Sequence, residues 1–340
     1  MTDSGSKIAV LGAGSWGTAL GILLAGNGHR VSLWGHLEED IAALRQDREN
    51  RHFLPGVPFP ELLSPSSDLA ECLNGADEIL VVVPSHAFAT VLQQIRKLNP
   101  GLKSLSWATK GLEPAQRRLM SEVARETFPD ADIAVLSGPT FAMEVARGLP
   151  TAITVASSST AHATRLADYL HSDTFRAYTS SDIIGVQVGG AAKNVMAIAA
   201  GMSDGQGFGA NARAALITRG LAEITRLGLA LGGQHDTFMG LAGLGDLVLT
   251  CTDDQSRNRR MGLALADGHG VEEARKRIGQ EVEGLAAARD FHIKAQDVGV
   301  EMPITEHVYR IIYKGLDPAA AVKALLSREQ KPEQSSRSGN

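Results

Sequence analysis

Cysteine is scarce in this chain. Its 340 residues include two, Cys72 and Cys251, which lie far apart in the sequence. Two isolated thiols cannot build the disulfide framework of a small secreted protein, and neither has a neighbour at metal-ligand spacing. We therefore expect buried or incidental thiols in a reducing compartment, and no metal site.

An excess of basic residues is also missing. The chain has 33 Lys and Arg against 38 Asp and Glu, which gives a formal net charge of -5. Nucleic-acid-binding proteins usually carry a basic face, so we expect no nucleic-acid partner. A small anionic substrate is still compatible with this balance, because a few local cations are enough to bind it.

Long hydrophobic runs are limited to the stretch 183–202, which has about the length of a membrane span. Gln187, Lys193 and Asn194 lie near its middle beside three glycines, and they favour a buried core helix instead. The N-terminal MTDSGSK is polar and lacks the hydrophobic region of a signal peptide. The sequence thus predicts a cytoplasmic protein without a membrane span.

The chain contains two segments with different patterns. From residue 7 to about 180, short β-rich runs alternate with amphipathic stretches, which is typical of a mostly parallel sheet with helices on both faces. The expected strands are KIAVL, RVSLW, EILVVV, KSLSWAT, DIAVLSG, TAITVAS and TFRAYT, and the expected helices include 15–26, 86–98 and 114–127.

After Asp182, a predicted N-cap, the strand signal ends. The expected helices are 183–202, 211–227, 257–266, 271–277, 281–299 and 303–314. The predicted fold is therefore a doubly wound α/β domain at 1–182, followed by an all-α domain at 183–327. The polar segment 328–340 is expected to be a disordered tail.

A glycine-rich turn joins the first expected strand to the first helix in KIAVLGAGSWGTAL. Gly12 permits a tight turn, Gly14 lets the backbone approach a pyrophosphate, and Gly17 lets the helix pack closely on the strand. The helix start then presents free N–H groups and the positive end of its dipole. This ordered context favours a Rossmann-type dinucleotide site over a turn of purely structural use.

The end of the second expected strand bears on which dinucleotide binds. NAD-specific sites usually carry Asp or Glu there, to hold the ribose 2′-hydroxyl. This strand ends in Trp34, Gly35 and His36, and the first carboxylate comes at Glu38. A 2′-phosphate would meet no repulsion and could contact His36, so NADP(H) is favoured and NAD(H) remains compatible. His36 could equally cap a loop.

Three further loops follow expected strands, at 84–88, 110–111 and 137–142. Ligands of open α/β sheets bind at such strand ends. The ring of Phe88 in the first loop could support a nicotinamide. Lys110 follows a strongly apolar β-rich run, and its position fits a site cation as well as a solvated loop lysine.

Lys193 lies in the apolar run, where an unpaired ammonium would be expensive to bury. Gly189 and Gly190 share its helix face, and each glycine costs about 1 kcal/mol relative to alanine. Open space for a ligand beside the ammonium would explain that cost. Burial also lowers the pKa of a lysine, which suits acid–base chemistry near neutral pH. The alternative is a lysine paired to a carboxylate for structure alone.

The segment GLAGLGDLVLTCTDDQSRNRR, at 240–260, places Asp246 after a glycine-rich bend. It ends in Ser256, Arg257 and Asn258 at an expected helix start. Hydroxyl, guanidinium and amide groups beside free N–H groups form a natural site for a phosphate or carboxylate. A basic helix start without a ligand fits the same residues.

Nine stretches of the chain form one further pattern, in the order GAGSWGTAL, VVVPSH, WATKGLE, SGPTFA, GGAAKN, GMSDGQGFGANARAALITRG, GLAGLGDLVLTCT, SRNRR and VEG. From about residue 7 to 325, this pattern resembles the bacterial NAD(P)-dependent glycerol-3-phosphate dehydrogenase family. The resemblance implies reversible reduction of dihydroxyacetone phosphate to sn-glycerol 3-phosphate with NAD(P)H, which supplies glycerophospholipid synthesis.

The resemblance also implies roles for individual residues, with Lys193 as the catalytic acid/base. The expected substrate-binding residues are Lys110, Gly138, Thr140, Lys193, Asp246, Ser256, Arg257 and Asn258. The expected cofactor-binding residues are the three glycines of the turn, Gly12, Gly14 and Gly17, together with Ser15, Trp16, His36, Lys110, Ala142, Arg257, Glu281 and Glu283. The family often has an apolar residue at the position of Glu281. A contact that the cofactor makes with the backbone there would be unaffected by this difference in side chain.

Two other functions fit parts of the pattern. A related β-hydroxyacid dehydrogenase also has a lysine on the first helix after its Rossmann domain, but its substrate is a carboxylate. A non-catalytic NADPH-binding sensor would keep the glycine turn, yet it would have no need of Lys110, Lys193, Asp246 and Arg257 together. The apolar helical domain favours a homodimer.

Overall fold

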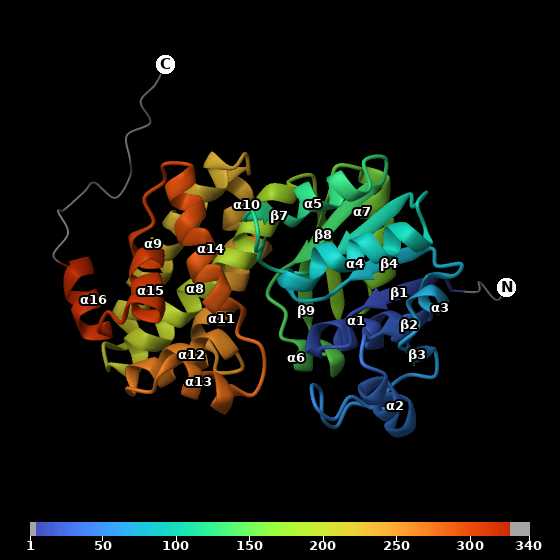
Figure 1. The fold of residues 1–340 in the computed structure, drawn as a ribbon, viewed down its shortest axis with the longest axis horizontal. Coiled ribbons are helices and arrows are strands. Elements are labelled where there is room, and N and C mark those ends of the chain that lie inside the picture. The colour runs from blue at the N-terminus through green and yellow to red at the C-terminus, as the bar shows by residue number, and fades with distance from the viewer. Residues whose placement is uncertain (1–4, 327–340) are drawn as a thin grey trace, which may run out of the picture.

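The computed structural model describes residues 5–326 and shows a sheet-based part followed by a helical part (Figure 1). One sheet of eight strands has the order β10-β9-β8-β5-β4-β1-β2-β3. The strands are β1 (Lys7–Leu11), β2 (Arg30–Trp34), β3 (Leu63–Ser66), β4 (Glu78–Val81), β5 (Ser104–Trp107), β8 (Asp132–Ser137), β9 (Thr151–Ser157) and β10 (Phe175–Ser180). All neighbours pair in parallel except β8 and β9, so the mostly parallel sheet is confirmed.

The edge strand β3 is the one strand of this sheet that sequence analysis missed. Its sequence, LSPS, is short and contains Pro65. Proline lacks the N–H that a central strand needs, and it is therefore tolerated mainly at a sheet edge. β3 pairs only with β2.

The two faces of the sheet carry separate cores because side chains alternate along a strand. In β1, Ile8 and Val10 pack in one buried cluster with residues of α1 and α7, whereas Ala9 and Leu11 pack in another with residues of α4 and α5. The helices of this part are α1 (Ser15–Gly26), α2 (Glu38–Asp47), α3 (Leu69–Leu73), α4 (Ser85–Leu98), α5 (Met120–Thr127), α6 (Ala142–Ala146) and α7 (Thr160–Leu170).

The predicted helix at 114–127 is wrong in its first half. A short antiparallel hairpin, β6 (Leu112–Glu113) with β7 (Arg118–Leu119), precedes α5. The Glu113 carboxylate accepts hydrogen bonds from the N–H groups of Ala115 and Gln116, both at 2.9 Å, and Arg117 has a left-handed φ of 54°. These local bonds hold the chain in a turn where amphipathic periodicity alone predicts a helix.

The helical part is built around α8 (Ile183–Gly205), which packs against α9, α11, α12 and α14. Its N-cap is Asp182, as predicted, because the Asp182 side chain accepts from the Gly185 N–H at 2.8 Å. The remaining elements are α9 (Gly209–Ala230), α10 (His235–Met239), the π-helical turn η1 (Leu241–Gly245), α11 (Asp246–Thr252), α12 (Arg257–Ala266), α13 (Val271–Ile278), α14 (Glu283–Asp297), α15 (Pro303–Lys314) and α16 (Pro318–Leu326). The short elements between 235 and 252 were not predicted, and the expected tail at 328–340 lies outside the described residues.

Among residues 5–326, α8 alone is long and apolar enough to cross a membrane by length and composition. Of its most apolar window, 94% is buried inside the protein. The helix is therefore a core helix here, surrounded by other helices (Figure 1).

Candidate active site

A cleft lies between the sheet-based part and the helical part, and residues of both line it. From the sheet-based part the lining residues are Ser15, Trp16, Phe53, Leu54, Ala108, Lys110, Thr140, Phe141, Ala142 and Met143. From the helical part they are Lys193, Asn194, Thr250, Gln255, Ser256, Arg257, Asn258, Arg260, Gln280 and Glu283.

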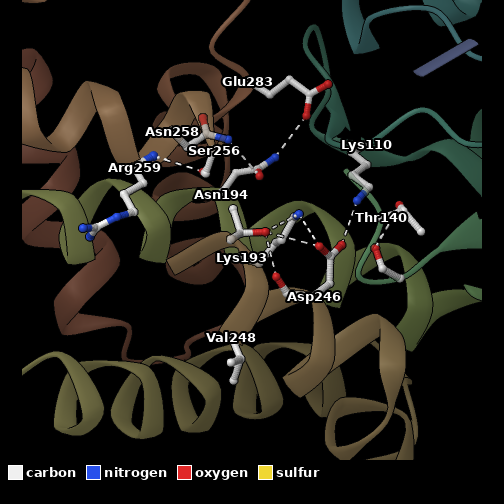
Figure 2. A network of polar contacts seen from close by, with 12 residues as sticks. Lys110, Thr140, Lys193, Asn194, Asp246, Val248, Ser256, Asn258, Arg259 and Glu283 are labelled. Atoms are coloured by element: carbon white, nitrogen blue, oxygen red, sulfur yellow. Dashed lines mark hydrogen bonds and ion pairs between the residues drawn. The ribbon is translucent and has the colours of Figure 1, made fainter. Parts of the chain in front are cut away.

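Asp246 joins two lysines at the base of this cleft (Figure 2). Its Oδ2 accepts a hydrogen bond from Lys110 Nζ at 2.7 Å, and its Oδ1 accepts one from Lys193 Nζ. Lys193 Nζ also donates to Thr250 Oγ1 at 2.6 Å. The Asp246 side chain is 1% exposed and that of Lys193 is 9% exposed, so solvent screens this pair weakly.

The local backbone brings these groups together. Asp246 opens α11 and Thr250 lies four residues later, on the same helix face. The Thr250 hydroxyl donates to the backbone carbonyl of Asp246 at 2.7 Å, so its lone pairs are left to accept from Lys193.

The expectation that Gly189 and Gly190 leave open space for a ligand is wrong. A Cβ at Gly189 would lie 2.6 Å from the carbonyl oxygen of Ala242, and a Cβ at Gly190 would lie 2.2 Å from Ser137 Oγ. Protein atoms fill both positions. The glycines instead allow η1 and the end of β8 to approach α8 closely, which brings the start of α11 toward Lys193.

Burial and neighbouring charges set the proton affinities of the group. Burial lowers the pKa of Lys193 to about 8, with Asp246 opposing this shift and Lys110 adding to it. Burial on its own would raise the pKa of Asp246, but Lys110 and Lys193 outweigh it and hold that pKa below its ordinary value. Asp246 is therefore an anion at neutral pH, and it accepts hydrogen bonds from both lysines.

A second polar group surrounds the start of α12. The Ser256 side chain caps this helix by accepting from the Arg259 N–H at 3.2 Å. Asn258 Nδ2 donates to Asn194 Oδ1 at 2.9 Å, and Asn194 Nδ2 donates to Glu283 Oε2 at 3.1 Å (Figure 2). These bonds fix the amide groups beside Lys193.

The glycine turn has the geometry of a dinucleotide cradle. Gly12 has a φ of +128°, and a Cβ there would lie 2.3 Å from the carbonyl oxygen of Val82. A Cβ at Gly17 would lie 1.8 Å from the carbonyl oxygen of Gly12, whereas a Cβ at Gly14 would meet nothing within 4 Å. The turn is thus packed tightly on the protein side and open at Gly14, where a phosphate can approach the start of α1.

Ten of the residues proposed from the sequence line the cleft: Ser15, Trp16, Lys110, Thr140, Ala142, Lys193, Ser256, Arg257, Asn258 and Glu283. Asp246 lies beneath its base. Gly138 is buried, and a Cβ there would lie 3.0 Å from Ile153 Cα. His36 and Glu281 are exposed and outside the lining.

The expectation for Phe88 is also wrong. Its ring is fully buried in α4 and packs edge-on against Trp107, with 5.9 Å between the ring centroids. Phe88 is absent from the cleft lining, so it does not support a bound ring.

Sequence analysis missed several lining residues. Thr250 could have been found from its i+4 spacing after Asp246, once 246–252 is known to be a helix. Phe53, Gln255 and Gln280 lie in irregular segments, and no sequence signal indicates that they meet across the cleft.

The fold and the site define a two-domain nicotinamide-dependent dehydrogenase, with a glycine turn on a parallel sheet and a buried, carboxylate-paired lysine on the helical part. The chain belongs to the NAD-dependent glycerol-3-phosphate dehydrogenase family. The N-terminal model of that family matches residues 7–163, and the C-terminal model matches residues 182–323.

Individual relatives agree with this membership. The chain is 58% identical to glycerol-3-phosphate dehydrogenase [NAD(P)+] of Shewanella halifaxensis over 333 residues, covering 97% of this chain and 98% of the relative. The crystal structure of glycerol-3-phosphate dehydrogenase from Coxiella burnetii matches with a TM-score of 0.93 at 47% identity, covering 95% of this chain and 99% of that one. A D-mandelate dehydrogenase structure matches with a TM-score of 0.60 at 15% identity, covering 93% of this chain and 99% of that one, which shows a shared fold alone.

Proposed function

We propose that this protein catalyses the reversible reduction of dihydroxyacetone phosphate to sn-glycerol 3-phosphate with NAD(P)H, as an enzyme that supplies glycerophospholipid synthesis. The observation that carries the proposal is Lys193, a buried lysine with a pKa of about 8 at the base of a cleft that begins at the glycine turn. The relatives' names support the substrate.

The glycine turn fits a dinucleotide, since Gly14 leaves open space at the start of α1. Ser15, Trp16 and Ala142 would hold the cofactor from the sheet side, and Arg257 and Glu283 from the helical side. When bound, the nicotinamide supplies or accepts the hydride at C2 of the substrate.

Residues of the chain transfer the proton that accompanies the hydride. An ammonium has three N–H donors, and Lys193 gives two of them to Asp246 and Thr250. The third is free for the substrate oxygen at C2, which Lys193 protonates during reduction. In oxidation, neutral Lys193 removes the proton from the substrate hydroxyl. Asp246 holds the lysine in place and also orients Lys110, which polarises the carbonyl group.

The start of α12 is the proposed phosphate site. Ser256, Arg257 and Asn258 lie on the cleft wall, and the first N–H groups of this ten-residue helix add positive potential. Thr140 completes the substrate site from the opposite wall, and the Gly138 backbone lies behind it.

For the cofactor, we propose NADP(H) ahead of NAD(H). Glu38, the first carboxylate after β2, accepts from the Arg45 guanidinium at 2.9 Å and from the Ser67 hydroxyl. Those bonds engage both carboxylate oxygens of Glu38 with protein partners, and exposed His36 is left to meet a 2′-phosphate. Glu281 would contribute through its backbone.

We also propose a cytoplasmic homodimer. Phe208 and Leu229, at the two ends of α9, are each 45% exposed and offer apolar surface to a second copy. Sedimentation velocity would test this: a single species at the monomer mass would contradict it.

The decisive experiment follows the absorbance of reduced nicotinamide with dihydroxyacetone phosphate, using NADPH and NADH in parallel. We expect substrate-dependent oxidation that is faster with NADPH. Binding of NADPH without oxidation would contradict the proposed reaction and favour a sensor. Turnover of a 2-keto or β-hydroxy acid instead would favour the hydroxyacid dehydrogenase alternative.

A further inference from the structure

Arg260 is a cation of the cleft to which neither the site nor the proposed reaction gives a role. It lines the cleft and is exposed, and within residues 5–326 its guanidinium has no hydrogen bond or ion pair with the protein. Its neighbour Arg259 differs in each respect. Arg259 is 8% exposed, donates to Asp254 at 2.8 Å and to Asp204, and points away from Lys193 (Figure 2).

Arg260 shares one helix face with Arg257, because residues three apart in a helix are neighbours. Arg257 also lines the cleft without a protein partner among the described residues. Arg257 is half-buried beside the helix start, whereas Arg260 lies one turn further along and is exposed. Arg260 therefore stands at the rim of the cleft.

The opposite wall supplies no free cation. Of its ten lining residues Lys110 is the only basic one, and Lys110 is bonded to Asp246 at 2.7 Å. Ser15 and Trp16 lie at the start of α1, where a dinucleotide diphosphate would bind. Among the residues that line the cleft, the free cations that could neutralise this diphosphate lie on the helical wall.

We propose that Arg260 is a cofactor-binding residue that contacts the diphosphate of NAD(P)H from the helical side. The proposal rests on the proposed use of NAD(P)H and adds a diphosphate contact to those already proposed for Arg257 and Glu283 on the helical side. The small substrate is held deeper, between Lys193 and the start of α12. A dinucleotide held both by α1 and by Arg260 links the two parts of the chain.

The test measures cofactor binding directly, by fluorescence titration of NADPH and of NADH without substrate. We expect Arg260→Ala to raise both dissociation constants about tenfold, since a hydrogen bond between charged groups is lost. Arg260→Lys should recover part of the affinity, because lysine keeps the charge but not the forked geometry. The salt dependence of binding should become shallower in Arg260→Ala.

The matched control is Arg125→Ala, which removes an exposed helical arginine of α5 that does not line the cleft. It should leave both dissociation constants unchanged. An unchanged Kd in Arg260→Ala would overturn the proposal, as would a higher KM for dihydroxyacetone phosphate alone. Loss of affinity for NADPH but not NADH would assign Arg260 to the 2′-phosphate and overturn the diphosphate contact. If the wild type binds NADPH but does not oxidise it, the proposed function fails while the titration still decides the role of Arg260.

Discussion

At Lys193, burial and the charge of Asp246 act in opposite directions, and the balance leaves a pKa of about 8. Reduction needs the ammonium, so kcat/KM for dihydroxyacetone phosphate should fall about tenfold per pH unit above about 8. Oxidation needs the neutral amine, so kcat/KM for glycerol 3-phosphate should rise up to about 8 and then level off. Initial rates in both directions from pH 6 to 10 would show this, and a flat reduction profile to pH 10 would contradict it.

Removing the Lys193 amine should stop the reaction without preventing the cofactor from binding. Lys193→Ala should lower turnover by orders of magnitude, because it removes the buried amine that exchanges the proton in the proposed reaction. NADPH binding, followed by fluorescence, should persist. Turnover close to that of the wild type would show that Lys193 is not the acid/base.

Thr250 offers a finer test of how Lys193 is held. Thr250→Val keeps the shape but removes the oxygen that accepts from Lys193 at 2.6 Å. An acceptor favours the ammonium, so its loss should lower the pKa of Lys193 further and move the alkaline fall in reduction to lower pH. Thr250→Ser, which keeps the hydroxyl, should restore the wild-type profile. A valine variant with lower activity but an unshifted profile would indicate a packing role only.

At the scale of elements, the first N–H groups of α15 donate hydrogen bonds to a side chain of α9. Glu223 of α9 accepts from the N–H groups of Ile304 at 2.7 Å and Thr305 at 3.2 Å, and it is 2% exposed. Glu223→Ala should lower the free energy of unfolding by about 2 kcal/mol, as the loss of a buried cap does. Urea unfolding would measure this, with exposed Glu61→Ala as the unchanged control.

The Glu223 carboxyl should also make the free energy of unfolding depend on pH. Burial raises the pKa of Glu223 to about 7, although the N–H groups of Ile304 and Thr305 oppose the shift. The folded state therefore holds more protons than the unfolded state between about pH 4.5 and 7, so this group's contribution to stability is lost as pH rises through that window. Glu223→Ala should remove that slope, and an unchanged slope would assign it to another group.

Sequence patterns predicted elements wherever local signals agree with tertiary packing. Long apolar strands, the Asp182 cap and the α1 glycine turn are such cases. Sequence patterns failed in the first half of the predicted helix 114–127, where a turn held by Glu113 side-chain bonds replaces the helix. They also failed at Gly189, because only the folded chain shows which backbone approaches it.

For the site, sequence motifs identified the residue types but not their distances. Lys110, Lys193 and Asp246 come from three separate motifs, and their bonds could not be derived without the fold. The exposed position of Glu281 likewise depends on how an irregular segment packs, and the burial of Phe88 depends on how α4 packs against β5.

At the scale of the whole molecule, the core of the helical part includes two residues of the sheet-based part. Leu112 and Leu119 belong to the β6–β7 hairpin that follows Lys110, yet they pack in the buried cluster of the helical part, with α8 and its neighbours. Leu112 is 1% exposed. The loop that carries Lys110 is thereby tied to the part that carries Lys193 and Asp246, so the catalytic group depends on both.

Leu112→Ala should therefore act on stability and on the site together. Truncating a buried leucine lowers the free energy of unfolding by roughly 2–5 kcal/mol. Because Leu112 packs in the core of the helical part, we expect the chain to unfold in a single transition at a lower temperature. Because Lys110 lies two residues away, KM for dihydroxyacetone phosphate should rise while NADPH binding changes little. Leu98→Ala, at a 50% exposed position at the end of α4, is the matched control and should change neither. Calorimetry that resolves two transitions, with only one shifted by Leu112→Ala, would mean that the parts fold independently and that the hairpin does not couple them.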